Sequence, residues 1–305
     1  MHQPLRPAAR GLLAALLVAL LVALLSALLI GPATAAPTTN TELVAVPTPG
    51  PVTIDGDLAD WDLSGMIYSC PDVGQYADVA AVRSAAMYDA DGLYLAFRWL
   101  DRTPMANQVD PDEPGKQDRG WASDSVQIRM CNDDEVHVTA WYYEGGDKPA
   151  LHVHFGKAVG ASGKPDLAAG LEHGARMAFR RHDDGAGYTQ ELFLPWKLVS
   201  RSGKRFQAGD SFSLGLHFNW GARDNKSTRE LQCQDVVANP EKVNRIFFWQ
   251  DRGAWGTIRL SPTGKLTLPP QPWDAAAVRP AGPDLTTAGV IALDYDLPEA
   301  ARVTL

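Results

Sequence analysis

The sequence lacks the short motifs by which most hydrolases and nucleotide-dependent enzymes are recognised. It contains no G-x-S-x-G, no H-E-x-x-H, no P-loop and no G-x-G-x-x-G that opens a helix. Acidic side chains are plentiful, but no motif places two carboxylates opposite each other as a glycosidase requires. We therefore expect a protein without catalytic activity of its own.

Cysteine is scarce as well. Cys70, Cys131 and Cys233 are widely spaced and form no C-x-x-C, which excludes a zinc ribbon or a redox motif of that type. In an oxidising compartment, three cysteines allow one disulfide at most, and the sequence does not choose among the three pairings. Three small buried side chains are the alternative interpretation.

Charge is absent from one long stretch near the N-terminus. Arg6 and Arg10 precede an apolar run over 11–30, and the small residues of 31–36 follow it. A basic start, an apolar stretch and a small-residue break predict a secretory signal peptide over 1–35. An uncleaved membrane anchor is the alternative, because an apolar run of this length can span a bilayer. We expect cleavage without stable membrane insertion, and a secreted, periplasmic or cell-surface protein.

Basic residues are outnumbered by acidic ones. The chain has 28 Lys and Arg against 36 Asp and Glu, a formal charge of −8, which becomes −10 when the leader and its two arginines are removed. A nucleic-acid partner would need a basic surface that neutralises phosphates, so we expect none. The hydrophobic content of 45% is enough for a large core and excludes wholesale disorder.

Helical periodicity is nearly absent, whereas short apolar alternations between Gly, Asp and Pro clusters are frequent. Such segments predict strands at 85–88, 93–99, 125–130, 135–143, 150–155, 188–194, 212–220, 245–249 and 256–260. The pattern predicts an all-β fold, an antiparallel, jelly-roll-like β-sandwich over 52–260. Short helical turns are expected near 59–62 and 196–200.

Segments rich in proline flank the predicted sandwich. We expect an unstructured spacer over 36–51 and a Pro/Ala-rich linker over 261–288. Residues 289–305 alternate as a strand, turn at 297–300 and start another strand, so they predict a truncated hairpin. This segment is similar to the opening of the Ig-like domains of flagellar hook-capping proteins, which implies the start of an incomplete Ig-like domain.

Six stretches follow one another in the predicted sandwich, at 52–62, 88–104, 120–130, 188–199, 209–219 and 247–260. In this order they resemble family 9 carbohydrate-binding modules, which implies a β-sandwich that binds a mono- or oligosaccharide and targets a larger extracellular protein to glycans. The architecture is also similar to the haem-binding subunit of ethylbenzene dehydrogenase-type enzymes. A haem b electron-transfer domain is therefore the alternative function, with Met105 and Lys197 as its ligand pair, although we expect no haem.

The resemblance to family 9 implies particular site residues. An aromatic side chain before a D-S-V-E motif forms one wall of the sugar slot in those modules, and Trp121 stands there, while Gln127 replaces the motif's acid. His137 and Thr139 match an Arg and an Asn on the following strand. The second aromatic wall would be Trp249 or Trp255 in a shortened loop.

Strand alternation points to the same face independently. If Tyr143 opposes Ala150 across the turn at 144–149, then Trp141 opposes His152 and Thr139 opposes His154. These four side chains, with His137, Gln127 and Trp121, are then predicted to line one accessible surface, on which a sugar could stack against a tryptophan. The alternatives are a polar face without a ligand and a metal site built on the His-x-His pairs.

Two further groups of residues carry predictions. Asp55 and Asp57 in a tight turn and Asp101 at a strand end match places where related sandwiches bind structural calcium, the candidate cofactor. Four tryptophans in apolar alternations are expected in the core, namely Trp61, Trp99, Trp196 and Trp220.

Overall fold

A computed structural model of the chain describes residues 37–114, 119–156, 166–222, 226, 228–233, 237–239, 241 and 251–271. The predicted signal peptide, the predicted strand 245–249 with Trp249, and the predicted C-terminal hairpin lie outside these residues. In the described part of the chain, none of the helices has the length and apolar character needed to cross a membrane.

The described elements are almost all strands. The strands are β1 (Glu42–Pro47), β2 (Ile67–Ser69), β3 (Ala80–Tyr88), β4 (Gly92–Asp101), β5 (Ser125–Cys131), β6 (Glu135–Tyr143), β7 (Lys148–Phe155), β8 (Asp166–Ala169), β9 (Arg176–Arg181), β10 (Gly187–Pro195), β11 (Ser211–Gly221), β12 (Arg229–Cys233) and β13 (Gly256–Leu260). The helices are single turns: α2 (Val73–Tyr76), α3 (Trp196–Val199), and the 3-10 turns η1 (Leu63–Gly65), η2 (Arg119–Ala122), η3 (Glu144–Gly146) and η4 (Arg252–Ala254).

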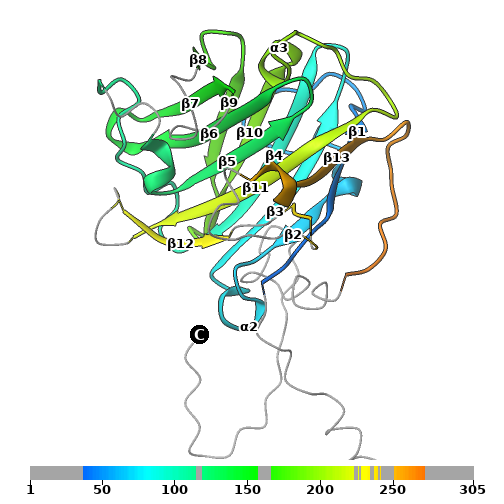
Figure 1. The fold of residues 1–305 in the computed structure, drawn as a ribbon. Helices are drawn as coiled ribbons and strands as arrows, with labels where there is room; N and C mark the ends of the chain where they lie inside the picture. The colour runs from blue at the N-terminus through cyan, green and yellow to red at the C-terminus, as the bar shows by residue number, and fades with distance from the viewer. Residues whose placement is uncertain are drawn as a thin grey trace, which may run out of the picture.

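The strands form two layers joined at one side. Their order is β8-β7-β6-β5-β11-β13-β1-β3-β4-β10-β9, with β12 beside β11 and β2 beside β3. Figure 1 shows β5 to β8 and β11 in front of β3, β4, β9 and β10, with β13 and β1 between the two groups. We call these groups the front layer and the back layer. The predicted β-sandwich is confirmed.

The first strand corrects two expectations. Glu42–Pro47 was predicted to be spacer, but it is a central strand, parallel to both β13 and β3, so the sheet is mixed rather than purely antiparallel. Both faces of β1 are buried, because Leu43 and Ala45 lie in the main core while Val46 packs in a second cluster on the outer face of the back layer. Most of the proline and threonine residues that suggested a spacer flank this strand, and Pro47 is its last residue.

Aromatic side chains fill the space between the layers. Trp99 is fully buried, stacks on Tyr188 with ring centroids 5.2 Å apart, and meets Phe218 and Trp220 edge to face. Such pairs add stability beyond the apolar area that they bury. All four tryptophans predicted to be core residues are buried. The three cysteines are buried too, and no disulfide joins them.

Candidate functional site

The β6–β7 hairpin has a register two residues away from the predicted one. Trp141 pairs with Ala150, Thr139 with His152 and His137 with His154, so the predicted Trp141–His152 and Thr139–His154 pairs are wrong. Asp147 caps the C-terminal end of the 3-10 turn η3, and its left-handed φ of 48° lets Tyr143 oppose Lys148. Because two residues are one full strand period, every side chain keeps its predicted face.

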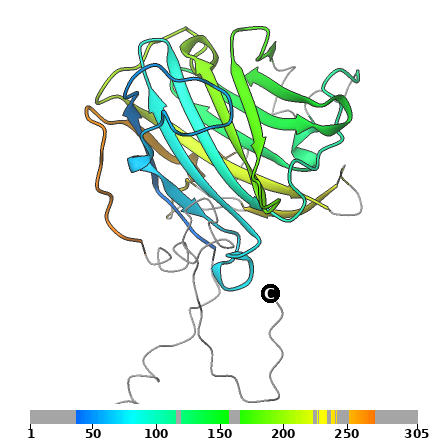
Figure 2. The same cartoon turned by 180° about the vertical axis from the view of Figure 1, so that it is seen from behind.

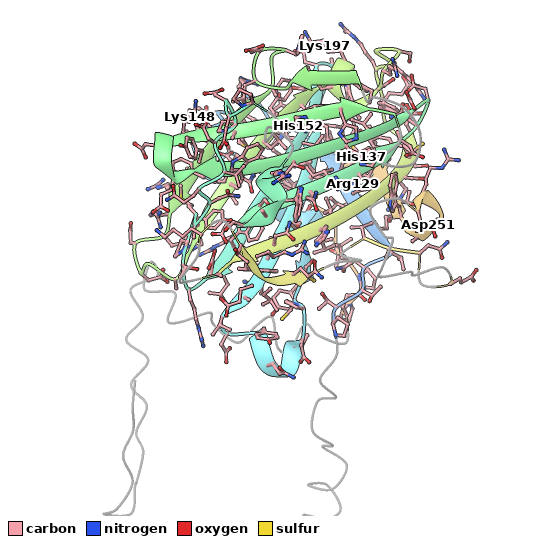
Figure 3. All side chains as sticks on the ribbon, turned by 60° about the vertical axis from the view of Figure 1, so that its left-hand side comes forward. Arg129, His137, Lys148, His152, Lys197 and Asp251 are labelled. Atoms are coloured by element: carbon pink, nitrogen blue, oxygen red, sulfur yellow. The ribbon has the colours of Figure 1, made fainter. Side chains whose placement is uncertain are left out.

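Polar side chains of four neighbouring strands form rows across the outer face of the front layer, which we call the polar face. The first row is His152, Thr139, Gln127 and His217, and the second is His154, His137 and Arg129. Figure 3 shows Arg129, His137 and His152 on three adjacent strands. Their neighbours in sequence, such as Val126, Ile128, Val138 and Val153, point into the core. The sheet thus separates a polar face from an apolar one.

The polar face is more deeply buried than predicted. Gln127, His137, Thr139, Trp141 and His152 are all buried, and His154 is half-buried. Of the seven residues expected on an accessible surface, Trp121 alone is strongly exposed, at 41%. Alternation along a strand selects a face, but it does not show which loops fold over that face.

Trp141 is covered by the loop between β4 and β5. Its indole Nε1 donates to the carbonyl oxygen of Val109 at 2.9 Å, and a Cβ atom on Gly120 would lie 2.3 Å from its ring. Asn107 holds the loop in place, donating from Nδ2 to the carbonyl oxygens of Gly120 at 2.7 Å and Asp124 at 3.0 Å. A sugar could stack on Trp141 only if this loop moved.

Trp121 lies in η2 at the margin of the polar face. The Arg229 guanidinium lies 5.7 Å from the centroid of its ring and donates to Asn219 Oδ1 at 3.1 Å. Asn219, from β11, donates in turn to Ser125 Oγ at 3.1 Å. These contacts link the exposed indole to Ser125 at the start of β5 and to Asn219 near the end of β11.

Three histidines of the polar face, His137, His154 and His217, are held neutral at physiological pH. Burial and then the charge of Arg129 lower the pKa of His137 to about 2. Burial and then Arg129 likewise lower the pKa of His217 to about 3, while burial and then the neighbouring His137 and His152 lower that of His154 to about 3. The His137 and His154 rings stack 4.6 Å apart. A neutral imidazole offers one donor and one acceptor, which suits a hydroxyl group.

Several buried polar atoms of this face lack hydrogen bonds within the described residues. They include Arg129 Nε and His154 Nε2. The Arg129 NH1 atom lies 3.5 Å from the carbonyl oxygens of Ile128 and Val138, and burial lowers the pKa of its guanidinium to about 10. A buried polar group without a partner costs about 1–3 kcal/mol.

The three aspartates predicted as calcium ligands lie in two separate places. Asp55 and Gly56 donate from their backbone N–H groups to Glu191, and the Asp57 carboxylate forms an ion pair with Arg180 at 2.9 Å. Asp101 is buried beside Asp124, and burial raises the pKa of both carboxyls. Among the described residues no three His, Cys, Asp or Glu side chains are grouped so that they could hold a metal ion.

The remaining predicted ligands are placed as follows. Trp255 is buried, with its ring edge-on to His137 at 6.0 Å, whereas Trp249 lies outside the described residues. Met105 is buried within the main core, and Lys197 is exposed on α3 (Figure 3).

The sequence itself shows the family of this domain. Residues 72–263 match the family model described as carbohydrate family 9 binding domain-like. The chain belongs to this family. The predicted resemblance is thereby confirmed over most of the sandwich. No curated protein matches the chain.

Solved structures with a similar fold have low sequence identity to this chain. A family 9 carbohydrate-binding module from Caldicellulosiruptor kristjanssonii in complex with cellotriose is 17% identical with a TM-score of 0.46, covering 75% of this chain and 98% of that one. The same organism's module in complex with glucose is 16% identical with a TM-score of 0.47, covering 75% and 100%. A putative carbohydrate-binding protein from Bacteroides uniformis is 11% identical with a TM-score of 0.49, covering 73% and 100%. At this similarity they say nothing about the ligand of this chain.

Sequence reasoning missed four residues of this face, namely Arg129, His217, Asn219 and Arg229. The first three were detectable, because Arg129 alternates with the core residues Ile128 and Met130, and "LHFNW" alternates His217 and Asn219 with Leu216 and Phe218. Arg229 reaches the face from β12, a strand that was not predicted at all.

Proposed function

We propose that this domain is a non-catalytic carbohydrate-binding module that binds a mono- or oligosaccharide at the polar face, with Trp121 as its stacking platform. Membership of the carbohydrate family 9 binding domain-like family supports the ligand class. The choice of site rests on one observation: two rows of polar side chains cross β7, β6, β5 and β11, and the exposed Trp121 lies at their margin.

The chemistry of the polar face suits a neutral sugar. An indole face packs on the apolar face of a pyranose, and the polar neighbours fix its hydroxyl groups. Gln127 and the neutral histidines can each donate and accept a hydrogen bond, so they match hydroxyls without demanding a charge. With one aromatic wall in the described residues, we expect a dissociation constant on the order of 10–1000 μM.

Calorimetric titration of the folded protein with a sugar panel tests this function. Glucose and cellotriose, which occupy the two Caldicellulosiruptor modules, are the first ligands to test. Trp121→Ala should abolish the heat of binding, whereas Leu171→Ala, which removes another exposed apolar side chain (38%), should not change it. Absence of heat with every sugar, or equal losses in the two variants, would contradict the proposal.

We further propose that the module is exported and targets a larger extracellular protein to glycans. The basic start, the apolar run over 11–30 and the small residues of 31–36 support export. N-terminal sequencing of the protein recovered from a secreting host should show cleavage after Ala35. A membrane-bound product that retains the apolar run would instead identify an anchor.

A further inference from the structure

A basic cleft lies on the outer face of the back layer, and the core separates it from the polar face. It encloses about 800 Å³ beside β3, β4, β9 and β10. Figure 2 turns this layer toward the viewer. Its floor is a row of side chains, Arg83, Arg98, Thr189 and Arg180, which we call the arginine row.

The arginine row is a consequence of strand register. Arg83 of β3 pairs with Arg98 of β4, Arg98 pairs with Thr189 of β10, and Thr189 pairs with Arg180 of β9. Four adjacent strands are separated by three spacings of about 4.8 Å, so the row is about 14 Å long. The residues come from segments far apart in sequence, and only the assembled sheet brings them together.

The row places like charges side by side. Directly opposed like charges destabilise a strand pair. Burial and the charge of Arg98 lower the pKa of Arg83, whereas Tyr68 acts to raise it. The Arg83 guanidinium lies over the Tyr68 ring at 5.5 Å, while Arg98 is exposed to the cleft. An anionic ligand that bridges Arg83 and Arg98 would relieve this repulsion.

Three acidic side chains also line the cleft, namely Asp57, Asp183 and Asp184. Asp57 forms an ion pair with Arg180 in which both side chains are more than half exposed, an arrangement that contributes little energy. Asp183 and Asp184 lie in the β9–β10 turn, where Asp184 accepts the backbone N–H of Ala186. None of the three is paired with Arg98 in the described hydrogen bonds and ion pairs. The floor of the cleft therefore remains basic, although the chain is acidic overall.

One wall of the cleft is apolar. It consists of Leu58, Ala59, Leu63 and Met66, and the Met66 side chain is 36% exposed. Leu58 and Leu63 pack against the cluster that contains Trp61, so the wall is anchored on the sheet. An apolar wall beside a basic floor fits an organic ring that carries anionic substituents better than it fits a bare inorganic anion.

We propose that the basic cleft is a second glycan-binding site, specific for an acidic oligosaccharide that carries carboxylate or sulfate groups. The guanidinium of Arg98 would bind the oxyanion through paired N–H donors, and Leu58 and Met66 would contact the apolar face of the ring. Arg180 would exchange its exposed partner Asp57 for the ligand. The site is independent of the sugar slot proposed on the opposite face.

Binding titrations at low ionic strength test this proposal with four probes: an oligogalacturonate, a sulfated heparin oligosaccharide, cellotriose and a single-stranded oligodeoxynucleotide. We expect the full chain to bind one or both acidic glycans, with affinity falling as salt rises. The variants Arg98→Gln and Arg98→Gln/Arg180→Gln should weaken that binding about tenfold or more, because each removes a charge-assisted contact. Arg205→Gln, at an exposed arginine elsewhere, is the matched control and should leave it unchanged.

The same variants separate this site from the sugar slot. Cellotriose binding should survive Arg98→Gln and fail in Trp121→Ala, and acidic-glycan binding should show the reverse. The proposal is overturned if neither acidic glycan binds, if Arg205→Gln weakens binding as much as Arg98→Gln, or if the oligonucleotide binds more tightly than both glycans. Binding of one glycan class alone identifies carboxylate or sulfate as the group that is recognised.

Discussion

Acid should unfold this domain through the buried histidines of the polar face. His137 and His217 have pKa values lowered to about 2 and about 3 by burial and by Arg129, with Arg229 also acting on His217. In the unfolded chain a histidine titrates near 6.5. A group whose pKa is lower in the folded state stabilises the fold fully above the unfolded pKa, and that stability is lost as pH falls toward the folded pKa.

The size of the effect follows from the two pKa values. Each pKa unit corresponds to about 1.4 kcal/mol. One such histidine should therefore lower the free energy of unfolding by about 2 kcal/mol between pH 7.5 and pH 5. His137 and His217 together should therefore lower the free energy of unfolding by about 4 kcal/mol over this range. Since small domains are stable by about 5–15 kcal/mol, much of the stability would be lost.

Urea denaturation at pH 7.5 and pH 5, followed by tryptophan fluorescence, measures this change. His217→Gln should lessen the acid-induced loss by about 2 kcal/mol, because glutamine cannot be protonated in the unfolded chain. His173→Gln, at an exposed histidine of the β8–β9 connection, is the matched control and should leave the loss unchanged. If His217→Gln also leaves the acid-induced loss unchanged, His217 is not held neutral by burial and the reasoning fails.

Three further predictions concern packing and buried charge. Trp99→Ala should lower the free energy of unfolding by about 3–5 kcal/mol in urea melts, because it empties the centre of the aromatic core. Trp121→Ala should leave the free energy of unfolding nearly unchanged. Equal losses in the two variants would place both residues in the core. Gly120→Ala should lower the free energy of unfolding by about 1–3 kcal/mol in the same assay, since the new Cβ would lie 2.3 Å from the Trp141 ring. No loss of stability would mean that the loop moves freely. Burial raises the pKa of Asp101 beside Asp124. Ionisation of this carboxyl should therefore lower the free energy of unfolding as pH rises above about 4. Asp101→Asn should reduce that loss of stability between about pH 4 and pH 7. An unchanged pH profile would contradict the raised pKa.

Much of the fold followed from local patterns in the sequence. The alternations predicted 135–143 and 256–260 with the bounds that β6 and β13 have in the structure. They also assigned the core tryptophans and the face of every side chain in the β6–β7 hairpin, because side-chain direction repeats every two residues regardless of distant contacts. Five strands were not predicted as strands. Glu42–Pro47 (β1) was predicted to be spacer, and β2, β8, β9 and β12 are short or, like Arg176–Arg181, rich in charged residues.

The site was predicted as a set of residue types but not as a surface. The sequence identified the family and the histidines of β6 and β7, yet the pairing of Thr139 with His152 depends on the conformation of Asp147 in the turn. Burial of Trp141 depends on the loop that Asn107 holds over it. Turn conformation and loop placement follow from contacts between distant segments, which periodicity does not encode.

The sequence by itself determined the β-sandwich, the two-residue alternation that gives the front layer a polar and an apolar face, and the membership of carbohydrate family 9. Only the tertiary structure decided which polar residues are buried, which tryptophan is exposed, and that arginines from β3, β4 and β9 line one cleft. The physical reason is the distance along the chain over which the two effects act. Alternation is set by the geometry of a single strand, whereas the neighbours of a side chain across a sheet are set by pairing between segments as far apart as Glu42 and Thr257.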